Sequence, residues 1–461
     1  MSGAFNTSSD RRSTKAALAL LRQYESRNVT FIEDDGSWPI VWDRAKGVQV
    51  WDMEGRRYLD LTGAFGVAAA GHANPAVVRA GRRQMGRLLH AMGDVHPHVW
   101  KGRLARELSR LTFERWTTAA TQPKQAGPRE APIPLVRGQT IFCNSGFEAV
   151  EAALKTARLV TGKRGVLAFE GAYHGLGYGA LNATHREHFR APFRDQLGQF
   201  GYFVPFPASP ESPGGDMNKA LSHVRKLLRT KPIGAVLIEP LQVRGGIKVP
   251  PAGWLAALRQ LCDAHDVLLV LDEIYTGFGR TGKWFACEHY GVVPDLICLG
   301  KALTGGFPLS ACVGRAEIMD GAWPSSAGEA IHTSTFLGHP VGCAMALAQI
   351  AEIERRQLVF RSAQLGHFLL QRLREIRPKK NRLMCRSRGL GLLAGLELLH
   401  SDGSAAGATA FAAVKAMLRH GYILLPEGGD GNVLGFTPPL TITKTQLEKA
   451  VGALEEVLSQ V

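Results

Sequence analysis

The chain has 461 residues, of which 45% are hydrophobic and 21% are charged. This composition is typical of a soluble globular protein of two or three domains, and it excludes a disordered chain or a fibre. Lys and Arg outnumber Asp and Glu by 55 to 40, which gives a net charge of +15. Because the positive charges are scattered, we do not expect a nucleic-acid partner. No apolar run reaches the roughly 18 residues of a membrane span, so we do not expect a membrane partner either.

The N-terminal residues 1–27 combine Arg, Ser and Lys with the short apolar run "AALALL". Either a transit peptide or a solvated lead-in helix explains this pattern. Residues 38–62 then alternate apolar and polar side chains around "AKG" and "MEG", which predicts a small antiparallel meander.

From about residue 71 to residue 320, short apolar runs alternate with helical stretches. Continuous apolar runs are typical of parallel strands that are buried on both faces. We therefore predict an α/β domain with a helix over 253–265 and with strands at 140–143, 165–169, 234–238, 267–271 and 296–299.

For the rest of the chain, the sequence pattern predicts a helical stretch from 340 to about 376. A strand at 391–398, a helix across 405–420 and a final helix are predicted to follow. This α+β unit is predicted to pack beside the N-terminal segment. The expected domains are a large one at 71–330 and a small one built from 1–70 and 331–461. The Pro- and Ala-rich residues 117–134 are predicted to form an exposed loop or insertion.

Seven cysteines are spread over the chain without C-x-x-C spacing. Several of them lie in apolar stretches, which is typical of reduced, buried thiols in a cytoplasmic protein. No metal site is expected.

Ligands of an open α/β sheet bind outside the carboxyl ends of the strands, so the residues after each apolar run are the candidates for a site. Ser145, Gly146 and Phe147 follow the strand at 140–143 and precede a helix. Such a turn binds phosphate through free N–H groups and the positive end of the helix dipole. Taken alone, the turn is better explained as a well-capped turn between a strand and a helix.

The next loops carry an aromatic residue and acids. Tyr173 and His174 lie in a glycine-rich loop, Glu239 and Gln242 follow the strand at 234–238, and Asp272 directly follows five apolar residues. A carboxylate in that position requires a cationic partner.

Lys301 follows the strand at 296–299. In an apolar crevice the charged form of a lysine is disfavoured, so its free amine can attack a carbonyl. A planar pyridine aldehyde would satisfy all of these groups, with Lys301 on the aldehyde, Asp272 on the protonated ring nitrogen and the 145–147 turn on a phosphate. Tyr173 and Ile274 would then enclose the ring. The predicted cofactor is pyridoxal phosphate.

Six ordered motifs carry a family resemblance: "NSGFEAVEAALKTAR", "AYHG", "EPLQ", "LDEIYTGFGRTG", "GKALTGGFPLSA" and "HTSTFLGHPVGCAMALA". From about residue 24 to its end, the chain resembles the class III (omega) aminotransferases, which are pyridoxal-phosphate enzymes of fold type I. The resemblance implies a homodimer with its active sites at the interface.

The resemblance also implies individual roles. Lys301 is the Schiff-base lysine, Asp272 binds the pyridine nitrogen, Tyr173 and Ile274 cover the two ring faces, and Gln242 lies near the ring hydroxyl. Thr335 would reach the phosphate from the neighbouring subunit. Further cofactor contacts are expected from His174, Glu239 and the phosphate-binding residues Ser145, Gly146 and Phe147.

The chain departs from the family where the substrate binds. Many members carry "EPIQGEGG" and an arginine shortly before "PPL", whereas this chain has Arg244 in "EPLQVRGG" and Gly435 in "LGFTPPL". Either the pocket takes an amine without an α-carboxylate, or Arg244 replaces the arginine from the other side, or Arg244 faces solvent. Phe65, Arg244 and Tyr275 are the expected substrate contacts.

The function expected from the resemblance is transfer of an amino group from an amine, diamine or ω-amino acid to pyruvate or 2-oxoglutarate by a ping-pong mechanism. A decarboxylase, an aminomutase or an α-amino-acid transaminase would share the lysine and the aspartate. A non-enzymatic binding module is a further alternative, which the intact Lys301 and Asp272 disfavour.

Overall fold

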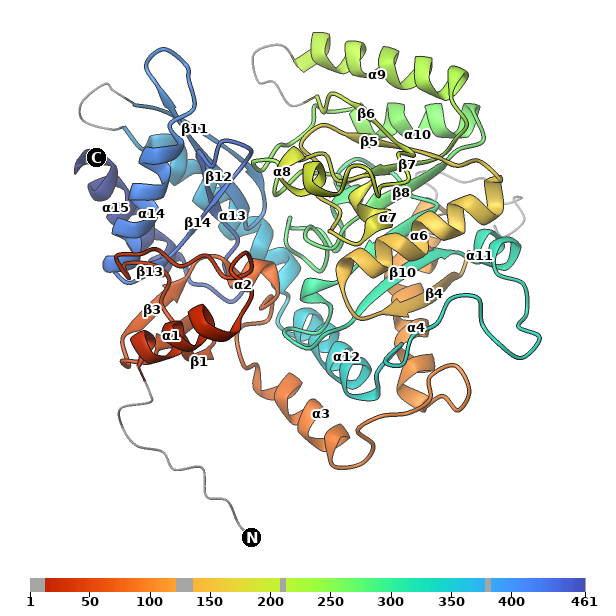
Figure 1. Cartoon of the computed structure of the whole chain (residues 1–461), viewed down its shortest axis with the longest axis horizontal. Helices are drawn as coiled ribbons and strands as arrows, with labels where there is room; N and C mark the ends of the chain where they lie inside the picture. The colour runs from red at the N-terminus through yellow and green to blue at the C-terminus, as the bar shows by residue number, and fades with distance from the viewer. Residues whose placement is uncertain (1–12, 122–135, 208–212, 378–382, 461) are drawn as a thin grey trace.

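The computed structural model describes residues 13–121, 136–207, 213–377 and 383–460. Its central sheet has seven strands in the order β4-β10-β9-β8-β7-β5-β6 (Figure 1). The strands are β4 (Gly138–Cys143), β5 (Gly165–Phe169), β6 (Gly201–Val204), β7 (Ile233–Ile238), β8 (Leu268–Asp272), β9 (Leu296–Leu299) and β10 (Ser310–Arg315).

Neighbouring strands from β6 to β9 pair in parallel, whereas β10 pairs antiparallel with both β9 and β4. The five strands predicted from apolar runs are present within two residues of their predicted bounds. The mostly parallel α/β fold is therefore confirmed. The prediction omitted β6 and β10.

Consecutive residues of the central strands enter two different apolar clusters. In β7, Ala235 and Leu237 belong to one cluster, and Val236 and Ile238 belong to the other. Since successive side chains of a strand point to opposite faces, the sheet is covered by apolar residues on both faces. This explains why its strands read as continuous rather than alternating apolar runs.

Helices supply the outer layers. Helix α6 (Gly146–Thr161) contributes small and aliphatic residues to one cluster, and α10 (Trp254–Ala264) contributes Trp254, Leu255 and Leu258 to the other. The remaining helices along the large sheet are α7 (Tyr178–Leu181), α8 (Glu187–Arg190), η3 (Ala191–Phe193), α9 (Pro213–Thr230), η4 (Ala286–His289), η5 (Lys301–Leu303) and α11 (Ala316–Ala322).

The predicted meander is confirmed. Strands β1 (Trp42–Lys46), β2 (Gln49–Asp52) and β3 (Arg57–Asp60) pair antiparallel, and the distant β13 (Tyr422–Ile423) joins β3 in parallel. The beginning and the end of the chain therefore share one sheet, at the left of Figure 1. A third sheet comprises β11 (Leu383–Leu390), β12 (Leu393–His400), β15 (Val433–Phe436) and β14 (Leu425–Glu427).

The other helices are α1 (Thr14–Tyr24), α2 (Gly63–Gly66), α3 (Pro75–Met85), α4 (Val99–Ser109), η2 (Arg110–Glu114), α5 (Arg115–Thr121), α12 (Pro340–Arg355), α13 (Leu358–Glu375), α14 (Gly407–Arg419) and α15 (Lys444–Gln460). Because α5 continues to Thr121, the prediction of a loop from 117 is wrong for its first five residues. The rest of that segment, 122–134, lies outside the described residues. Across the described ranges, no helix combines the length and apolarity needed to cross a bilayer.

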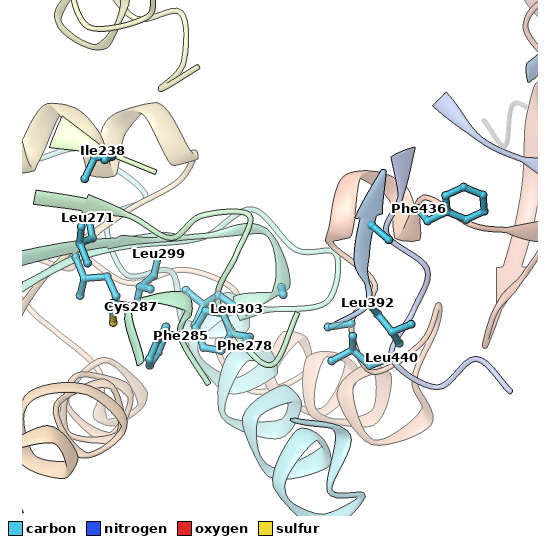
Figure 2. Packing of buried hydrophobic residues seen from close by; sticks show 14 of the residues in the cluster. Ile238, Leu271, Phe278, Phe285, Cys287, Leu299, Leu303, Leu392, Phe436 and Leu440 are labelled. Atoms are coloured by element: carbon cyan, nitrogen blue, oxygen red, sulfur yellow. The ribbon is translucent and has the colours of Figure 1, made fainter. Parts of the chain in front are cut away.

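One apolar core connects the large sheet to the C-terminal elements. Figure 2 shows it running from Ile238, Leu271 and Leu299 through a middle group to the C-terminal side. The middle and C-terminal members are Cys287, Phe285, Phe278, Leu303, Leu392, Leu440 and Phe436. This packing holds the loops after β8 and β9 against the last strands of the chain.

The cysteines are free thiols in the part of the chain that the structure describes. Six are buried, and Cys385 is half-buried. The expectation of buried thiols therefore holds for six of the seven.

A glycine contact tests the packing of α13. A Cβ added to the buried Gly366 would lie 2.1 Å from the backbone of Gly391, whereas a Cβ added to the exposed Gly102 of α4 meets no atom within 4 Å. Equilibrium urea denaturation should give a free energy of unfolding about 3 kcal/mol lower for Gly366→Ala. The control Gly102→Ala should be neutral or more stable by up to about 1 kcal/mol. Wild-type stability of Gly366→Ala would contradict this packing.

Candidate active site

A cavity of about 420 Å³ opens where five strands of the large sheet end. Each of the loops after β4, β5, β7, β8 and β9 contributes to its wall, as expected for an open α/β sheet. The lining residues are Gly146, Phe147, Tyr173, His174, Gly175, Leu176, Glu239, Arg244, Asp272, Ile274, Tyr275 and Lys301.

Lys301 begins η5 directly after Gly300 and has a φ of +39°, in the left-handed region that non-glycine residues rarely adopt. Such strain is found mainly at functional sites. The Nζ atom lies 4.6 Å from the ring centroid of Tyr275. Burial lowers the pKa of Lys301, and the nearby Asp272 and Glu239 oppose this effect only in part. A neutral amine is therefore more accessible here than on an exposed lysine.

Asp272 ends β8 with only 5% of its surface exposed. Its Oδ2 atom lies 2.8 Å from Nδ1 of His174, and its Oδ1 atom accepts the backbone N–H of Ile274 at 3.1 Å. Among the described residues, this carboxylate is thus held by His174 and by the backbone of Ile274. The other ring nitrogen of His174, Nε2, is buried and has no hydrogen-bond partner among the described residues.

Glu239 lies in the same wall and accepts the backbone N–H groups of Tyr173 at 3.2 Å and Val243 at 3.1 Å. Burial raises the pKa of Glu239 to about 7, and the Coulombic effects of His174 and Asp272 act in opposite directions. This carboxyl is therefore partly protonated near neutral pH. Nearby, Gln242 donates from Nε2 to the carbonyl of Glu170 at 2.9 Å, and its buried Oε1 has no partner within the described ranges.

The turn before α6 provides hydrogen-bond donors for a ligand. Glu148 caps it by accepting the N–H groups of Asn144 at 2.6 Å and Ser145 at 3.1 Å. The Oγ atom of Ser145 is buried without a partner in the described structure. The first N–H groups of a helix have no intrahelical acceptor, so Gly146 and Phe147 can donate outward. A hydroxyl and two amides at a helix N-terminus make an anion site.

Ile274 occupies the space beside this turn. A Cβ on Gly146 would lie 3.0 Å from Ile274 Cδ1, and a Cβ on Gly300 would lie 3.3 Å from Ile274 Cγ2. Ile274 therefore forms the apolar floor between the anion site and Lys301. Tyr173 lies in the wall formed by the loop after β5.

Arg244 also lines the cavity. Its Nη1 atom lies 3.1 Å from Oε2 of Glu427, and its guanidinium lies 5.9 Å from the ring centroid of Tyr173. Glu427 is buried, and burial raises its pKa to about 6 although Arg244 favours the charged form. Arg244 is thus ion-paired in the wall and does not simply face solvent. Gly435 lies beside the same acid, since a Cβ there would be 3.1 Å from Glu427 Cγ.

Four expected site residues are not part of the cavity lining of this chain. Phe65 belongs to α2, has a φ of +60° and is 51% exposed. Thr335 is exposed in the loop before α12. Ser145 and Gln242 are not part of the lining either, although each carries a buried polar atom without a partner among the described residues.

Sequence reasoning missed Glu427, which is 183 residues from its partner Arg244. Its only local signal is an acid after the apolar "YILLP". Across the described residues, no group of His, Cys, Asp and Glu could hold a metal ion. The cavity therefore offers an anion site, a buried carboxylate and an amine of lowered pKa, which together suit covalent chemistry on a carbonyl compound that carries an anionic group.

Comparisons with known proteins identify the family. A family model described as aminotransferase class-III matches residues 31–458. The chain is 36% identical over 431 residues to 5-aminovalerate aminotransferase of Pseudomonas aeruginosa, covering 92% of this chain and 94% of the relative. It is 35% identical over 432 residues to putrescine aminotransferase of Pectobacterium atrosepticum, covering 92% and 84%.

A solved structure agrees. The ornithine aminotransferase of Toxoplasma gondii, described with partial occupancy of pyridoxal phosphate at its active site, superposes with a TM-score of 0.81 and 26% identity, covering 98% of this chain and 95% of the other. The cofactor of this chain is pyridoxal phosphate, its fold is that of the pyridoxal-phosphate aminotransferases, and its activity is transamination. The chain belongs to the class III aminotransferases.

Proposed function

We propose that the enzyme transfers the amino group of an amine, diamine or ω-amino acid to a keto acid, pyruvate or 2-oxoglutarate. The observation that carries the donor class is Gly435, which supplies no guanidinium and lies beside the buried Glu427, the partner of the lining residue Arg244. A carboxylate on the reacting carbon would find no arginine at this position, so donors without one are favoured. The names of the relatives, 5-aminovalerate and putrescine aminotransferase, fit this donor class.

The residues of the cavity fit pyridoxal phosphate. The unpartnered Ser145 Oγ and the first N–H groups of α6 would bind the phosphate. Asp272 would bind the ring nitrogen, and the side-chain amide of Gln242, whose Oε1 has no partner among the described residues, would bind the ring hydroxyl. Tyr173 and Ile274 would cover the ring faces. When bound, the cofactor supplies an aldehyde for covalent attachment of amino groups and a ring that accepts electrons from the substrate carbon.

Lys301 is the proposed proton-transfer group as well as the covalent anchor. Its Nζ atom, with the pKa lowered by burial, can accept a proton from the carbon that bears the substrate amino group. It then returns the proton during the exchange. The ring of Tyr275, which lies 4.6 Å from Nζ and whose hydroxyl lies 3.2 Å from Thr437 Oγ1, restricts where this amine can move.

His174 and Glu239 have supporting roles in this proposal. His174 holds Asp272 Oδ2 at 2.8 Å, which keeps the carboxylate directed along the cavity floor. Glu239, which is partly protonated because its pKa is raised to about 7, adds less negative charge beside Asp272 than a fully ionised acid would. Asp272 would then be the main acidic partner of a protonated ring nitrogen.

We also propose a homodimer whose partner subunit supplies Thr335. Exposed apolar side chains support this proposal, because Leu89, Met92, Val95 and Val99 are 50–61% exposed in the segment before and at the start of α4. Asp94 in this segment accepts a hydrogen bond from Thr333 at 2.6 Å, so the patch continues into the loop of Thr335. A second copy of the chain would cover it.

Phe65 and Tyr275 remain proposed substrate contacts. The two are close in the fold, since Gly66, the neighbour of Phe65, packs against the Tyr275 ring.

The proposed domains are a large one at 71–330 and a small one formed by 1–70 and 331–461, supported by the pairing of β13 with β3. We propose a cytoplasmic location, supported by the free thiols of the described cysteines.

The lowered pKa of Lys301 predicts a pH dependence for cofactor capture. The ammonium form cannot attack an aldehyde, so the rate at which cofactor-free protein regains its visible absorbance should rise with pH and level off. Because the pKa is lowered, the midpoint should lie below 10.5, the ordinary value of a lysine. Lys301→Ala should regain no absorbance, whereas the exposed Lys449→Ala should behave as wild type. A midpoint at or above 10.5 would contradict the environment described for Lys301.

The unpartnered hydroxyl of Ser145 predicts a role in phosphate affinity. Ser145→Ala removes a hydrogen bond to a charged group, which should weaken pyridoxal-phosphate affinity about tenfold. Titration of cofactor-free protein measures this change. Ser387→Ala is the matched control, because its hydroxyl is also buried without a described partner but belongs to strand β11 and not to the turn before α6. Equal cofactor affinity of both variants and wild type would remove Ser145 from the site.

The donor class is tested by half-reactions of the holoenzyme. Conversion of the cofactor to its amine form, followed by absorbance, should be about tenfold faster or more with 5-aminopentanoate and 1,4-diaminobutane than with leucine, because no guanidinium lies at Gly435. A keto acid should then restore the original spectrum. Lys301→Ala should convert with none of the donors. Conversion by leucine alone would overturn the proposed donor class.

A further inference from the structure

Two arginines lie near one buried carboxylate beside the cavity. Arg244 pairs with Glu427 through a single contact of 3.1 Å. Arg186, which directly precedes α8, also interacts electrostatically with Glu427, with Arg244 and with Tyr173. The group of two guanidiniums and one carboxylate therefore carries an excess positive charge when all three are ionised.

Contacts between rings and cations connect Arg186 to the cavity wall. The Arg186 guanidinium lies 5.4 Å from the ring centroid of Phe189, whose ring lies 5.5 Å from that of Tyr173. Tyr173 in turn lies 5.9 Å from the guanidinium of Arg244. Arg186 is thus placed beside the lining residues Tyr173 and Arg244 rather than on a remote surface.

The neighbouring acid does not neutralise Arg186. Glu187 forms its ion pairs with Arg190 and Arg194. Within the described residues, the guanidinium of Arg186 has no ion pair or hydrogen bond, although the residue is half-buried. Burial first, and then the charge of Arg244, lower the pKa of its guanidinium. A half-buried cation without a counter-ion is costly, and an incoming anion would relieve that cost.

We propose that Arg186 and Arg244 form a subsite for the carboxylate at the far end of a linear substrate, with Glu427 holding Arg244 in place. This inference rests on the proposed function and specifies its substrate class as ω-amino acids, with a dicarboxylic keto acid as acceptor. Guanidinium groups recognise carboxylates through paired N–H donors, and the single contact to Glu427 leaves other N–H groups of Arg244 for this purpose. The apolar stem of the substrate would lie along Tyr173.

Two donors that differ only in the distal carboxylate test the subsite. The second-order rate constant for cofactor conversion should be higher with 5-aminopentanoate than with pentylamine in the wild-type holoenzyme. Arg186→Met and Arg244→Met should each lower the ratio of the constant for 5-aminopentanoate to that for pentylamine about tenfold or more, since methionine keeps the apolar stem and removes the charge that the distal carboxylate would meet. Arg194→Met is the control for net charge, because Arg194 is exposed and pairs with Glu187, and it should change neither constant. Equal losses with both donors would overturn the subsite.

A binding measurement separates this inference from the proposed function. Glutarate has the distal carboxylate but no amino group, so calorimetry of its binding to the holoenzyme does not depend on turnover. Affinity should fall about tenfold in Arg186→Met and Arg244→Met and stay unchanged in Arg194→Met. If no amine converts the cofactor but glutarate shows this pattern, the proposed function fails and the subsite stands. Equal glutarate affinity in all four proteins would refute the subsite.

Discussion

The site depends on the convergence of one lysine amine, an anion-binding helix terminus and a buried carboxylate in the wall of a single cavity. Burial lowers the pKa of Lys301, and the charges of Asp272 and Glu239 limit the effect. Asp272 itself is held by His174 and by the backbone of Ile274. Each of these groups follows a different strand, so the parallel sheet is what brings them to one edge.

Much of this arrangement follows from the sequence because the strands are buried on both faces. The residues of β5 and the first four residues of β8 are uniformly apolar, and the first polar residue after each run must lie at the sheet edge. Asp272 and Lys301 stand out for that reason. Strand β10 escaped prediction because Ser310, Ala311 and Gly314 interrupt its apolar pattern with small residues, although its first five residues are buried.

Contacts between distant segments could not be predicted in the same way. Glu427 meets Arg244 across 183 residues, and His174 meets Asp272 across 98. Neither pairing has a local periodicity that would reveal it. Arg186 is even harder to predict as a site residue, because it is one arginine among several near α8. It differs from Arg190 and Arg194 in forming no ion pair with Glu187. Its interest arises from the charges that the fold places around it.

The central claim is that Lys301 and Asp272 bind opposite ends of the same cofactor ring. Nuclear magnetic resonance of holoenzyme carrying cofactor labelled with ¹⁵N in the ring tests this most directly. The account predicts a protonated ring nitrogen at pH 8 in the wild type and an unprotonated one in Asp272→Asn, since the amide cannot stabilise the positive charge. The same protonation state in both proteins would contradict it.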